Sequence, residues 1–293
     1  MRRRTLLKSV LTLPMAASAA GGTSSAGDQA GAFFSGLAGF DYALGGLKQG
    51  SLACIVGPPC MGKTLLLLEL AARIVRRYGR NVVFFSAQKP SVYVAKKAVL
   101  RNDMTVVFAG ETAGDLDSRT EGSAIYLLDA NSADIEQAFE FTRRLRHGHP
   151  AGCALVILDG WSTYTSMEVD GEAVCGAGFP AARWAHENLS RRVLVCAQRF
   201  SHATRMPVVM GVTTASLLNK ARQVNSLDLE AAMRIAADRW VSLHRPAVYE
   251  ESAKFAEEQR NVVCLTGTSP QWWDTRCSKL RFDPRRMGFD TVV

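Results

Sequence analysis

The sequence predicts an α/β protein in which a mostly parallel sheet is flanked by helices and ends in an antiparallel hairpin. Short apolar runs alternate with helical patterns along the chain, which favours parallel strands connected by helices. The last two runs are separated by the turn-rich segment 267–271, which favours a hairpin. The expected strands cover residues 52–56, 81–86, 124–129, 153–159, 192–197, 240–244, 261–266 and 278–282. The expected helices cover residues 64–78, 90–101, 132–147, 180–190 and 226–237.

The composition is that of a globular chain with a moderate excess of basic residues. Hydrophobic residues make up 47% and charged residues 21% of the 293 positions, which excludes a disordered, collagen-like or multi-span membrane chain. Lysine and arginine number 35 against 27 acids, and the net charge of +8 favours an anionic partner. The seven cysteines include no C-x-x-C pair, so reduced, structural thiols are expected. His147, His149 and Cys153 are a near-cluster of metal ligands, for which a solvated turn is the preferred interpretation.

A phosphate-binding motif lies between an expected strand and an expected helix. Residues 57–64 read Gly-Pro-Pro-Cys-Met-Gly-Lys-Thr, which fits G-x-x-x-x-G-K-[ST] without a mismatch. In such a loop, backbone N–H groups and a helix N-terminus surround the phosphates, the lysine reaches the terminal phosphates and the hydroxyl binds Mg²⁺. The motif therefore predicts nucleotide and Mg²⁺ binding. The expected nucleotide-binding residues are Gly57, Pro58, Cys60, Met61, Gly62, Lys63 and Thr64.

A second element is expected to supply an acid to the metal beside Thr64. The apolar run 153–158 is followed at once by Asp159, as a buried parallel strand would present a carboxylate at its carboxyl end. Asp129 closes the run 124–128 in the same way and is the competing candidate. Asp159 is preferred, because its run is longer and more apolar and the segment after it is polar and irregular.

The first 35 residues are expected to form a leader ahead of a core at residues 36–293. Three arginines, an apolar stretch over 10–20 and small residues at 17–19 give residues 2–20 the order of a twin-arginine export signal. The alternatives are a frayed basic leader and a misassigned start. The apolar stretch is shorter than the roughly 18 residues that span a bilayer, so no permanent transmembrane helix is expected. Because an ATP-using protein needs cytoplasmic nucleotide, a cytoplasmic location is preferred over export.

The order of the segments resembles the C-terminal motor domain of the DnaB-type replicative helicases, which belong to the RecA-like ATPases. The resemblance covers about residues 36–290, and apart from the phosphate loop its pieces are individually weak, whereas their order is specific. The segments that carry it are Gly39–Gly50, the phosphate loop, Phe84–Pro90, Ile125–Asp129, the run that ends at Asp159, Val193–Gln198, Ala236–Arg245 and Leu280–Pro284.

The resemblance implies a RecA-like fold, ATP with Mg²⁺ as cofactors, single-stranded DNA as partner and a ring-shaped homo-oligomer. By position, Gln198 would link the γ-phosphate to the DNA-facing loops, and the loops after Asp159 and after Gln198 would face the channel of the ring. The second loop holds basic residues suited to a phosphate backbone, although a solvated basic surface is the alternative. The expected DNA-binding residues are Arg199, Arg205, Lys220 and Arg222.

Two positions depart from the family's pattern. The family's glutamate that polarises the attacking water is replaced by Gln88, which can orient a water but cannot accept its proton. The family's lysine and arginine that reach a neighbouring subunit's nucleotide have no counterpart in the stretch 263–275, and the first basic residue is Arg276. A trans-acting arginine contributes on the order of 10³–10⁵ in rate. Hydrolysis is therefore expected to be slow.

The leading hypothesis is a DnaB-helicase-like ATPase that binds ATP–Mg²⁺ and acts on single-stranded DNA. Its expected catalytic residues are Lys63, Gln88 and Gln198, and its metal ligands are Thr64 and Asp159. The alternative is a nucleotide-binding module without turnover that acts as a regulatory or structural DNA-associated subunit, and the residue at position 88 favours it. An exported protein that retains only the fold is a third idea, which rests on residues 2–20.

Overall fold

The computed structural model divides the chain into two units, Met1–Ala30 and Gly31–Val293. All residues that the structure describes belong to the second unit. These residues are 31–58, 60–87, 94, 105–108, 122–129, 135–162, 168–169, 172–173, 193–213, 236–249, 256–269 and 272–292.

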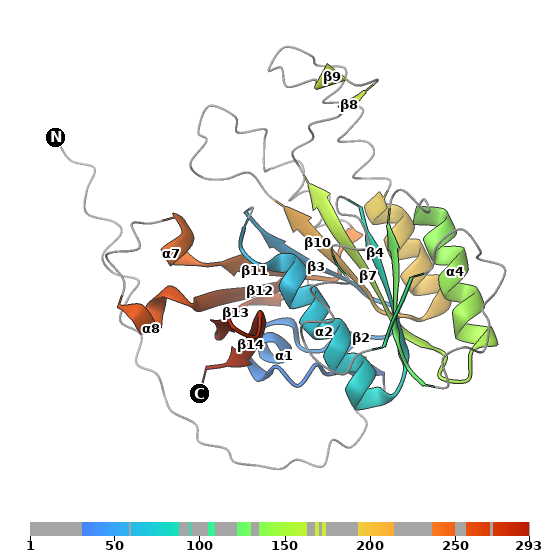
Figure 1. Cartoon of the computed structure of the whole chain (residues 1–293), viewed down its shortest axis with the longest axis horizontal. Coiled ribbons are helices and arrows are strands. Elements are labelled where there is room, and N and C mark those ends of the chain that lie inside the picture. Colours follow the sequence, from blue (N-terminus) through green and yellow to red (C-terminus); the bar gives the residue numbers. More distant parts are fainter. Residues whose placement is uncertain are drawn as a thin grey trace. The chain divides into compact units, whose positions relative to one another are not determined.

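A ten-stranded sheet forms the framework of this unit (Figure 1). Seven neighbouring strands, from β11 to β5, run parallel, and β12, β13 and β14 extend the sheet with antiparallel pairings. The predicted mostly parallel sheet with antiparallel C-terminal strands is confirmed. Across the sheet the strands are β14 (Gly288–Thr291), β13 (Trp272–Asp283), β12 (Val262–Ser269), β11 (Arg239–His244), β3 (Leu52–Gly57), β10 (Val208–Thr213), β7 (Cys153–Ser162), β4 (Asn81–Ser86), β6 (Ile125–Asp129) and β5 (Val106–Phe108).

Helices cover both faces of the parallel strands and bury two separate apolar clusters. The 16-residue helix α2 (Lys63–Tyr78) packs its leucines on one face, together with inward-facing residues of β3, β4 and β7. Helix α4 (Ile135–Gly148) and a helix over 193–204 pack on the other face. Because both faces are covered, all six residues of β3 are buried, which explains its uninterrupted apolar run.

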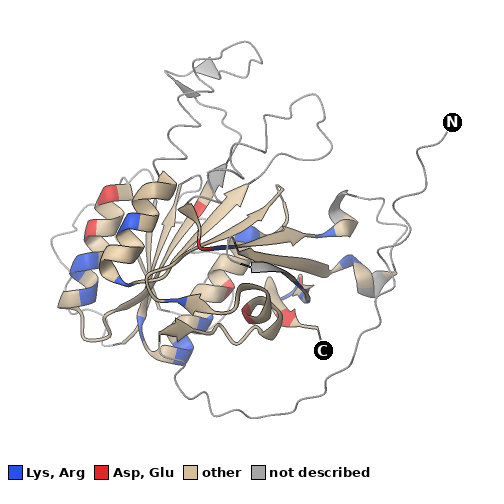
Figure 2. Ribbon diagram, turned by 180° about the vertical axis from the view of Figure 1, so that it is seen from behind, with Lys and Arg blue, Asp and Glu red and all other residues tan. Residues whose placement is uncertain are grey.

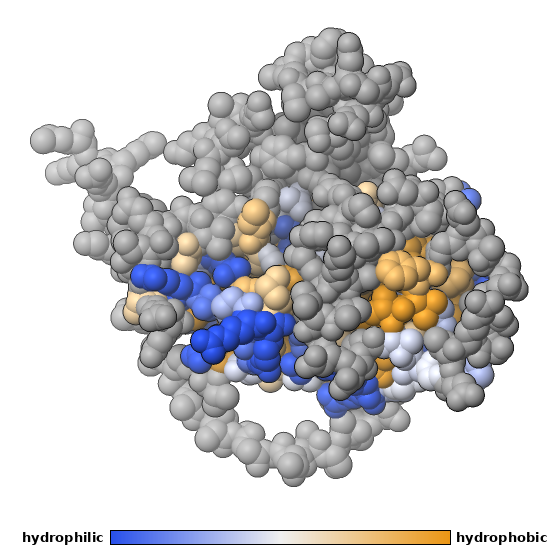
Figure 3. All heavy atoms as spheres, viewed as in Figure 1, coloured by the Kyte–Doolittle hydropathy of each residue, from blue (hydrophilic) through white to orange (hydrophobic). Residues whose placement is uncertain are grey.

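Shorter elements complete the described part of the chain. Helix α1 (Ala38–Leu44) packs over β11, β12 and β13. The remaining elements are β1 (Ala32–Phe33), β2 (Leu47–Lys48), β8 (Glu168–Val169), β9 (Glu172–Ala173), α7 (Pro246–Tyr249) and α8 (Glu257–Arg260). Figure 3 shows hydrophilic side chains over the β12–β14 end of the sheet and apolar surface towards the β5 side, where Phe108 is 51% exposed.

The strand expected over 192–197 is wrong, because residues 193–204 form a helix. The central strand next in the chain is β10, which lies between β3 and β7 and has no counterpart among the expected strands. Buried Val193, Leu194, Ala197 and Phe200 recur at helical spacing and pack on the α4 face of the sheet. The short apolar run that was expected to form a strand is therefore the buried face of a helix.

Other expectations concern the cysteines, the histidines and membrane-spanning helices. The cysteines described there are free thiols, and no group of metal-ligating side chains is found among them. His149 is buried rather than solvated, and its Nδ1 lies 2.9 Å from Asn81 Nδ2. None of the described helices is both long and apolar enough to span a bilayer. The expected helices at 180–190 and most of 90–101 and 226–237 lie outside the described residues.

Candidate functional site

The phosphate loop connects the carboxyl end of β3 to the first residue of α2. Gly62 caps the helix in the left-handed region with a φ of 92°, where a glycine is the favoured residue. Cys60 also has a positive φ, 63°, and is exposed at the tip of the loop, whereas Met61 is fully buried beneath it. Helix α2 therefore begins at this loop and presents its first backbone N–H groups there, as an anion site requires. Pro59 lies outside the described residues.

Gly57 is a glycine because the neighbouring strand leaves no room for a side chain. A Cβ at this position would lie 2.6 Å from the carbonyl oxygen of Leu243 in β11. Relief of that contact would require backbone movement, since the obstacle is itself a main-chain atom. The close approach of β11 thereby fixes where the loop leaves the sheet.

Lys63 places its ammonium inside the loop. Its Nζ donates hydrogen bonds to the carbonyl oxygens of Gly57 at 2.8 Å and Pro58 at 2.7 Å, and the residue is only 8% exposed. Thr64 follows in the first turn of α2 and is half-buried. The loop thus brings a buried cation and a hydroxyl together at a helix N-terminus, which is the chemistry that a phosphate and its metal ion need.

Asp159 lies on the same face of the sheet as α2 and is only 2% exposed. Leu155 and Ile157 precede it by four and two residues on the same face of β7, and both belong to the cluster that α2 covers. The neighbouring strand makes room for its carboxylate at Gly211. A Cβ at Gly211 would lie 2.7 Å from Leu67 Cδ1 in α2 and 3.1 Å from Asp159 Oδ1.

The carboxyl ends of four adjacent parallel strands bring polar groups to one edge. Thr213 of β10 is paired in register with Gly57 of β3, and Ser86 of β4 is paired with Asp159 of β7. The ladder between β10 and β7 shifts register just beyond Leu158, and such irregularities redirect side chains beside functional sites. Ligands of open α/β sheets bind at this edge. We call it the carboxyl edge.

Strand order favours one of the two candidate acids. Strand β7 is two positions from β3, whereas β6, which ends at Asp129, is four positions away. At about 4.8 Å per strand, the two carboxyl ends lie roughly 10 Å and 19 Å from that of β3. A metal ion beside Thr64 would therefore lie closer to the carboxyl end of β7 than to that of β6, which favours Asp159 over Asp129. A hydroxyl and a carboxylate are also the hard oxygen ligands that Mg²⁺ prefers.

Of the other two expected catalytic residues, one lies outside the described residues and one lies on a helix. Gln88 lies outside the described residues, two positions beyond the end of β4. Gln198 lies on the helix over 193–204 and not at the end of a strand, so the structural premise for its role is wrong. Thr213 is the last residue of β10, the strand that follows β7, and it has the place at a strand end that was expected for Gln198.

The four expected DNA-binding residues do not share one loop. Arg199 lies on the helix over 193–204, and Arg205 is exposed in the turn after it, next to Gly50 at the amino end of β3. Arg205 is therefore at the sheet edge opposite the phosphate loop, which corrects its expected position. Lys220 and Arg222 follow β10 and lie outside the described residues.

Arg245 is a residue of the carboxyl edge that was not predicted from the sequence. It directly follows β11, and its backbone N–H lies 3.2 Å from Met61 Sδ of the phosphate loop. Its guanidinium lies 4.8 Å from the centre of the Phe282 ring, and its Nε is buried with no hydrogen-bond partner among the described residues. Burial lowers the pKa of the guanidinium from its usual value. The available signal was an arginine directly after the strand expected over 240–244.

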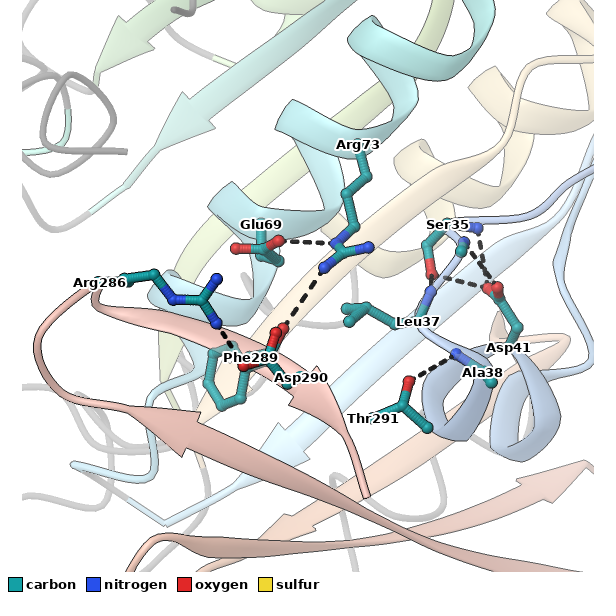
Figure 4. Close-up of polar contacts among 11 residues, drawn as sticks. Ser35, Leu37, Ala38, Asp41, Glu69, Arg73, Arg286, Phe289, Asp290 and Thr291 are labelled. Carbon is teal, nitrogen blue, oxygen red and sulfur yellow. Dashed lines mark hydrogen bonds and ion pairs between the residues drawn. The ribbon is translucent and has the colours of Figure 1, made fainter. Parts of the chain in front are cut away.

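The C-terminal strand β14 packs beside helix α2 (Figure 4) and contacts the glycine that precedes this helix. Phe289 of β14 is 2% exposed, and its Cζ lies 3.4 Å from the position of a Cβ on Gly62. Arg73 of α2 pairs with Glu69 at 2.6 Å and also reaches the Phe289 carbonyl at 3.5 Å. These contacts tie β14 to the N-terminal cap and the first three turns of α2.

Arg276, the first basic residue of the antiparallel extension, contacts its own chain. Its Nη1 lies 3.4 Å from the carbonyl oxygen of Tyr42 in α1, and its guanidinium lies 5.7 Å from the centre of the Tyr42 ring. Side-chain positions of Trp272 and Trp273 lie outside what the structure describes.

Comparisons with known proteins agree with this fold. Residues 33–160 match the family model of the DnaB-like helicase C terminal domain. The chain is similar to a solved structure described as an ATPase domain, with 17% identity over 92% of this chain and 94% of that chain and a TM-score of 0.64. It is also similar to "The Structure Of A DnaB-Like Replicative Helicase And Its Interactions With Primase", with 16% identity, 91% of this chain and 64% of that chain covered and a TM-score of 0.63. No curated protein matches the sequence.

Proposed function

Because residues 33–160 carry a DnaB-type helicase C-terminal domain on a RecA-like fold, we propose that this chain binds ATP with Mg²⁺ at the carboxyl edge and acts on single-stranded DNA. The observation that carries the proposal is the buried ammonium of Lys63, held by two loop carbonyls at the N-terminus of α2. Such an ammonium can exchange carbonyl oxygens for the more strongly charged oxygens of a triphosphate.

Each group of the carboxyl edge has a role in the proposal. Lys63 and the backbone N–H groups of the loop bind the phosphates, and Thr64 with Asp159 would hold Mg²⁺, which neutralises phosphate charge when bound. Thr213, at the end of β10, takes the position first expected for Gln198. The flat guanidinium of Arg245, already stacked on an aromatic ring, would offer a surface for the nucleotide base.

Slow hydrolysis is part of the proposal. The carboxamide of Gln88 can orient an attacking water without accepting its proton. Arg276 is engaged with Tyr42 of its own chain, which argues against its reaching a neighbouring subunit's nucleotide. The positions that would complete the site therefore favour tight nucleotide binding over rapid turnover. Use of ATP supports a cytoplasmic location, and a ring of identical subunits is proposed by family resemblance.

The test compares ATP binding and turnover among single variants of the full chain, with and without single-stranded DNA. Lys63→Ala should abolish nucleotide binding. Asp159→Asn should weaken ATP binding in Mg²⁺ but not in EDTA, and Asp129→Asn is the matched control that should match the wild type in both. Equal losses in Asp159→Asn and Asp129→Asn would contradict the assignment of the metal ligand. Undetectable ATP binding by the folded wild-type chain would contradict the whole proposal.

The second candidate function is a nucleotide-binding module without turnover, which the glutamine at position 88 favours. A motor predicts ATP turnover that rises with single-stranded DNA and vanishes in Lys63→Ala. The module predicts tight ATP binding with negligible turnover, which Gln88→Glu would restore only in part. The same measurements therefore separate the two functions.

A further inference from the structure

A dense basic surface lies at the edge of the sheet opposite the nucleotide site. Helices α2, α4 and the helix over 193–204 run antiparallel to the strands and all end at this edge, as helices of a doubly wound sheet do. Figure 2 shows that the acidic residues of α4 lie towards one of its ends and the basic residues towards the other. We define the amino-edge surface by Arg80, Arg143, Arg144, Arg146 and Arg205.

Contacts connect Arg80, Arg146 and the turn that holds Arg205, while Arg143 and Arg144 lie in the same last turns of α4 as Arg146. Arg80 Nη2 lies 3.5 Å from the carbonyl oxygen of Cys153, at the start of β7. A Cβ on Gly152, one residue earlier, would lie 3.2 Å from Arg80 Nη2 and 3.6 Å from the Arg146 carbonyl oxygen. Arg146 in turn donates to the carbonyl of Thr204, which directly precedes Arg205. The ends of all three helices therefore meet around the first residues of β7.

The charge at this edge exceeds what the helix ends require. The segments 76–82, 143–152 and 199–207 contain no acidic residue. Glu140 pairs with Arg143 at 3.0 Å, but both side chains are about half exposed, and such pairs contribute little. One cation near a helix C-terminus already gives the favourable interaction with the helix dipole. Further arginines at the same ends, among them the exposed Arg144 and Arg205, add positive charge that a bound polyanion would neutralise.

The surface suits a phosphate backbone better than a folded protein. Protein interfaces depend on buried apolar and aromatic anchors. The large hydrophobic side chains exposed among the described residues are Tyr42 and Phe108, and neither belongs to the amino-edge surface. Guanidinium groups instead match phosphates in planar, paired hydrogen bonds. Without aromatic side chains to stack on bases, the contacts would follow the backbone and be independent of base sequence.

We propose that the amino-edge surface binds the phosphate backbone of a nucleic acid, as a second contact separate from the loops of the carboxyl edge. Strands of six residues, such as β3, separate the two edges by about 20 Å. The nucleotide site and this surface are therefore independent, and nucleic acid bound at the amino edge does not need ATP.

The test measures binding of a labelled single-stranded oligonucleotide and of a duplex to the full chain by fluorescence anisotropy, without nucleotide, over a range of salt concentrations. The double variant Arg144→Glu/Arg205→Glu should weaken binding at least tenfold. Loss of two phosphate contacts should lower the slope of log affinity against log salt by about 1.4–1.8. The matched control Arg281→Glu/Arg285→Glu changes the net charge equally at exposed positions of β13 and the turn after it, and should keep the wild-type slope.

Equal weakening in the two double variants, or none in either, would overturn the proposal. If the glutamate variant melts below the assay temperature, Arg144→Gln/Arg205→Gln should lower the slope by the same amount. Anionic phospholipid vesicles and polyglutamate are competitors at matched charge. If either displaces the oligonucleotide from the wild type as well as unlabelled oligonucleotide does, the nucleic-acid assignment is wrong. This assay contains no nucleotide. A failure of the proposed ATP binding would therefore leave its result interpretable, and the two proposals can fail separately.

Discussion

Replacement of Gly211 by alanine tests how the central strands make room for Asp159, the proposed metal ligand. The added Cβ would lie 2.7 Å from Leu67 Cδ1, about 1 Å closer than a normal carbon–carbon contact, and 3.1 Å from Asp159 Oδ1. Overpacking of this size costs about 1–3 kcal/mol. For a chain of this length, the melting temperature should fall by roughly 2–4 °C per kcal/mol, so by about 2–12 °C in total.

The same substitution should also weaken nucleotide binding in a metal-dependent way. Because the new methyl group pushes on the carboxylate of Asp159, calorimetric titration with ATP should show a lower affinity in Mg²⁺ and an unchanged affinity in EDTA. Gly148→Ala is the control, since a Cβ there has nothing within 4 Å. A Gly211→Ala protein that melts within 1 °C of the wild type and keeps its Mg²⁺-dependent affinity would refute the reasoning.

Three further outcomes are expected. Phe289→Ala should lower the free energy of unfolding in urea by about 3–5 kcal/mol and weaken ATP binding, because the buried ring supports Gly62; a loss below 1 kcal/mol would contradict this. Asn81→Ala should lower the same free energy by about 2–5 kcal/mol, because its amide satisfies the buried Ala124 N–H and Gly152 carbonyl; an unchanged urea midpoint would speak against it. Saturating Mg²⁺–ATP should slow maleimide labelling of Cys60 several-fold but leave the equally exposed Cys277 unaffected, as followed by peptide mass spectrometry, and equal rates at both thiols would argue against a nucleotide over the loop.

Much of the parallel half of the sheet is predictable from sequence because its strands are buried on both faces. The runs that form β3, β4 and β7 show no polar alternation, and each is bounded by turn residues. The phosphate loop is equally predictable, since its glycines and lysine follow from the backbone geometry that an anion requires. Both depend on interactions between residues close in the sequence, which a linear pattern records.

The residues over 193–213 show why other parts could not be predicted. The run that begins at Val193 is too short for periodicity alone to separate a strand from a half-buried helix. The following run, Val208–Thr213, is the true central strand, and Pro207 before it was the available signal. Because of this error, Gln198 was expected at the strand end that Thr213 occupies. The expected DNA-binding loop was misplaced for the same reason.

The choice of metal ligand depends on strand order, which sequence does not contain. Asp129 and Asp159 both close apolar runs, and the run lengths gave only a preference between them. The order of strands places one carboxyl end about twice as far from β3 as the other. Arg245 was missed for the same reason, because its role depends on β11 lying beside β3.

The position of β3 within the sheet has a mechanical consequence. Among the described strands, β3 alone joins the β11–β14 half to the β10–β5 half, through parallel ladders on both of its sides. Amide protons of Cys54, Ile55 and Val56 should therefore be among the last to exchange with deuterated water, because their release requires the two halves to part. Any ligand that tightens the loop at the end of this seam would also hold the two halves together.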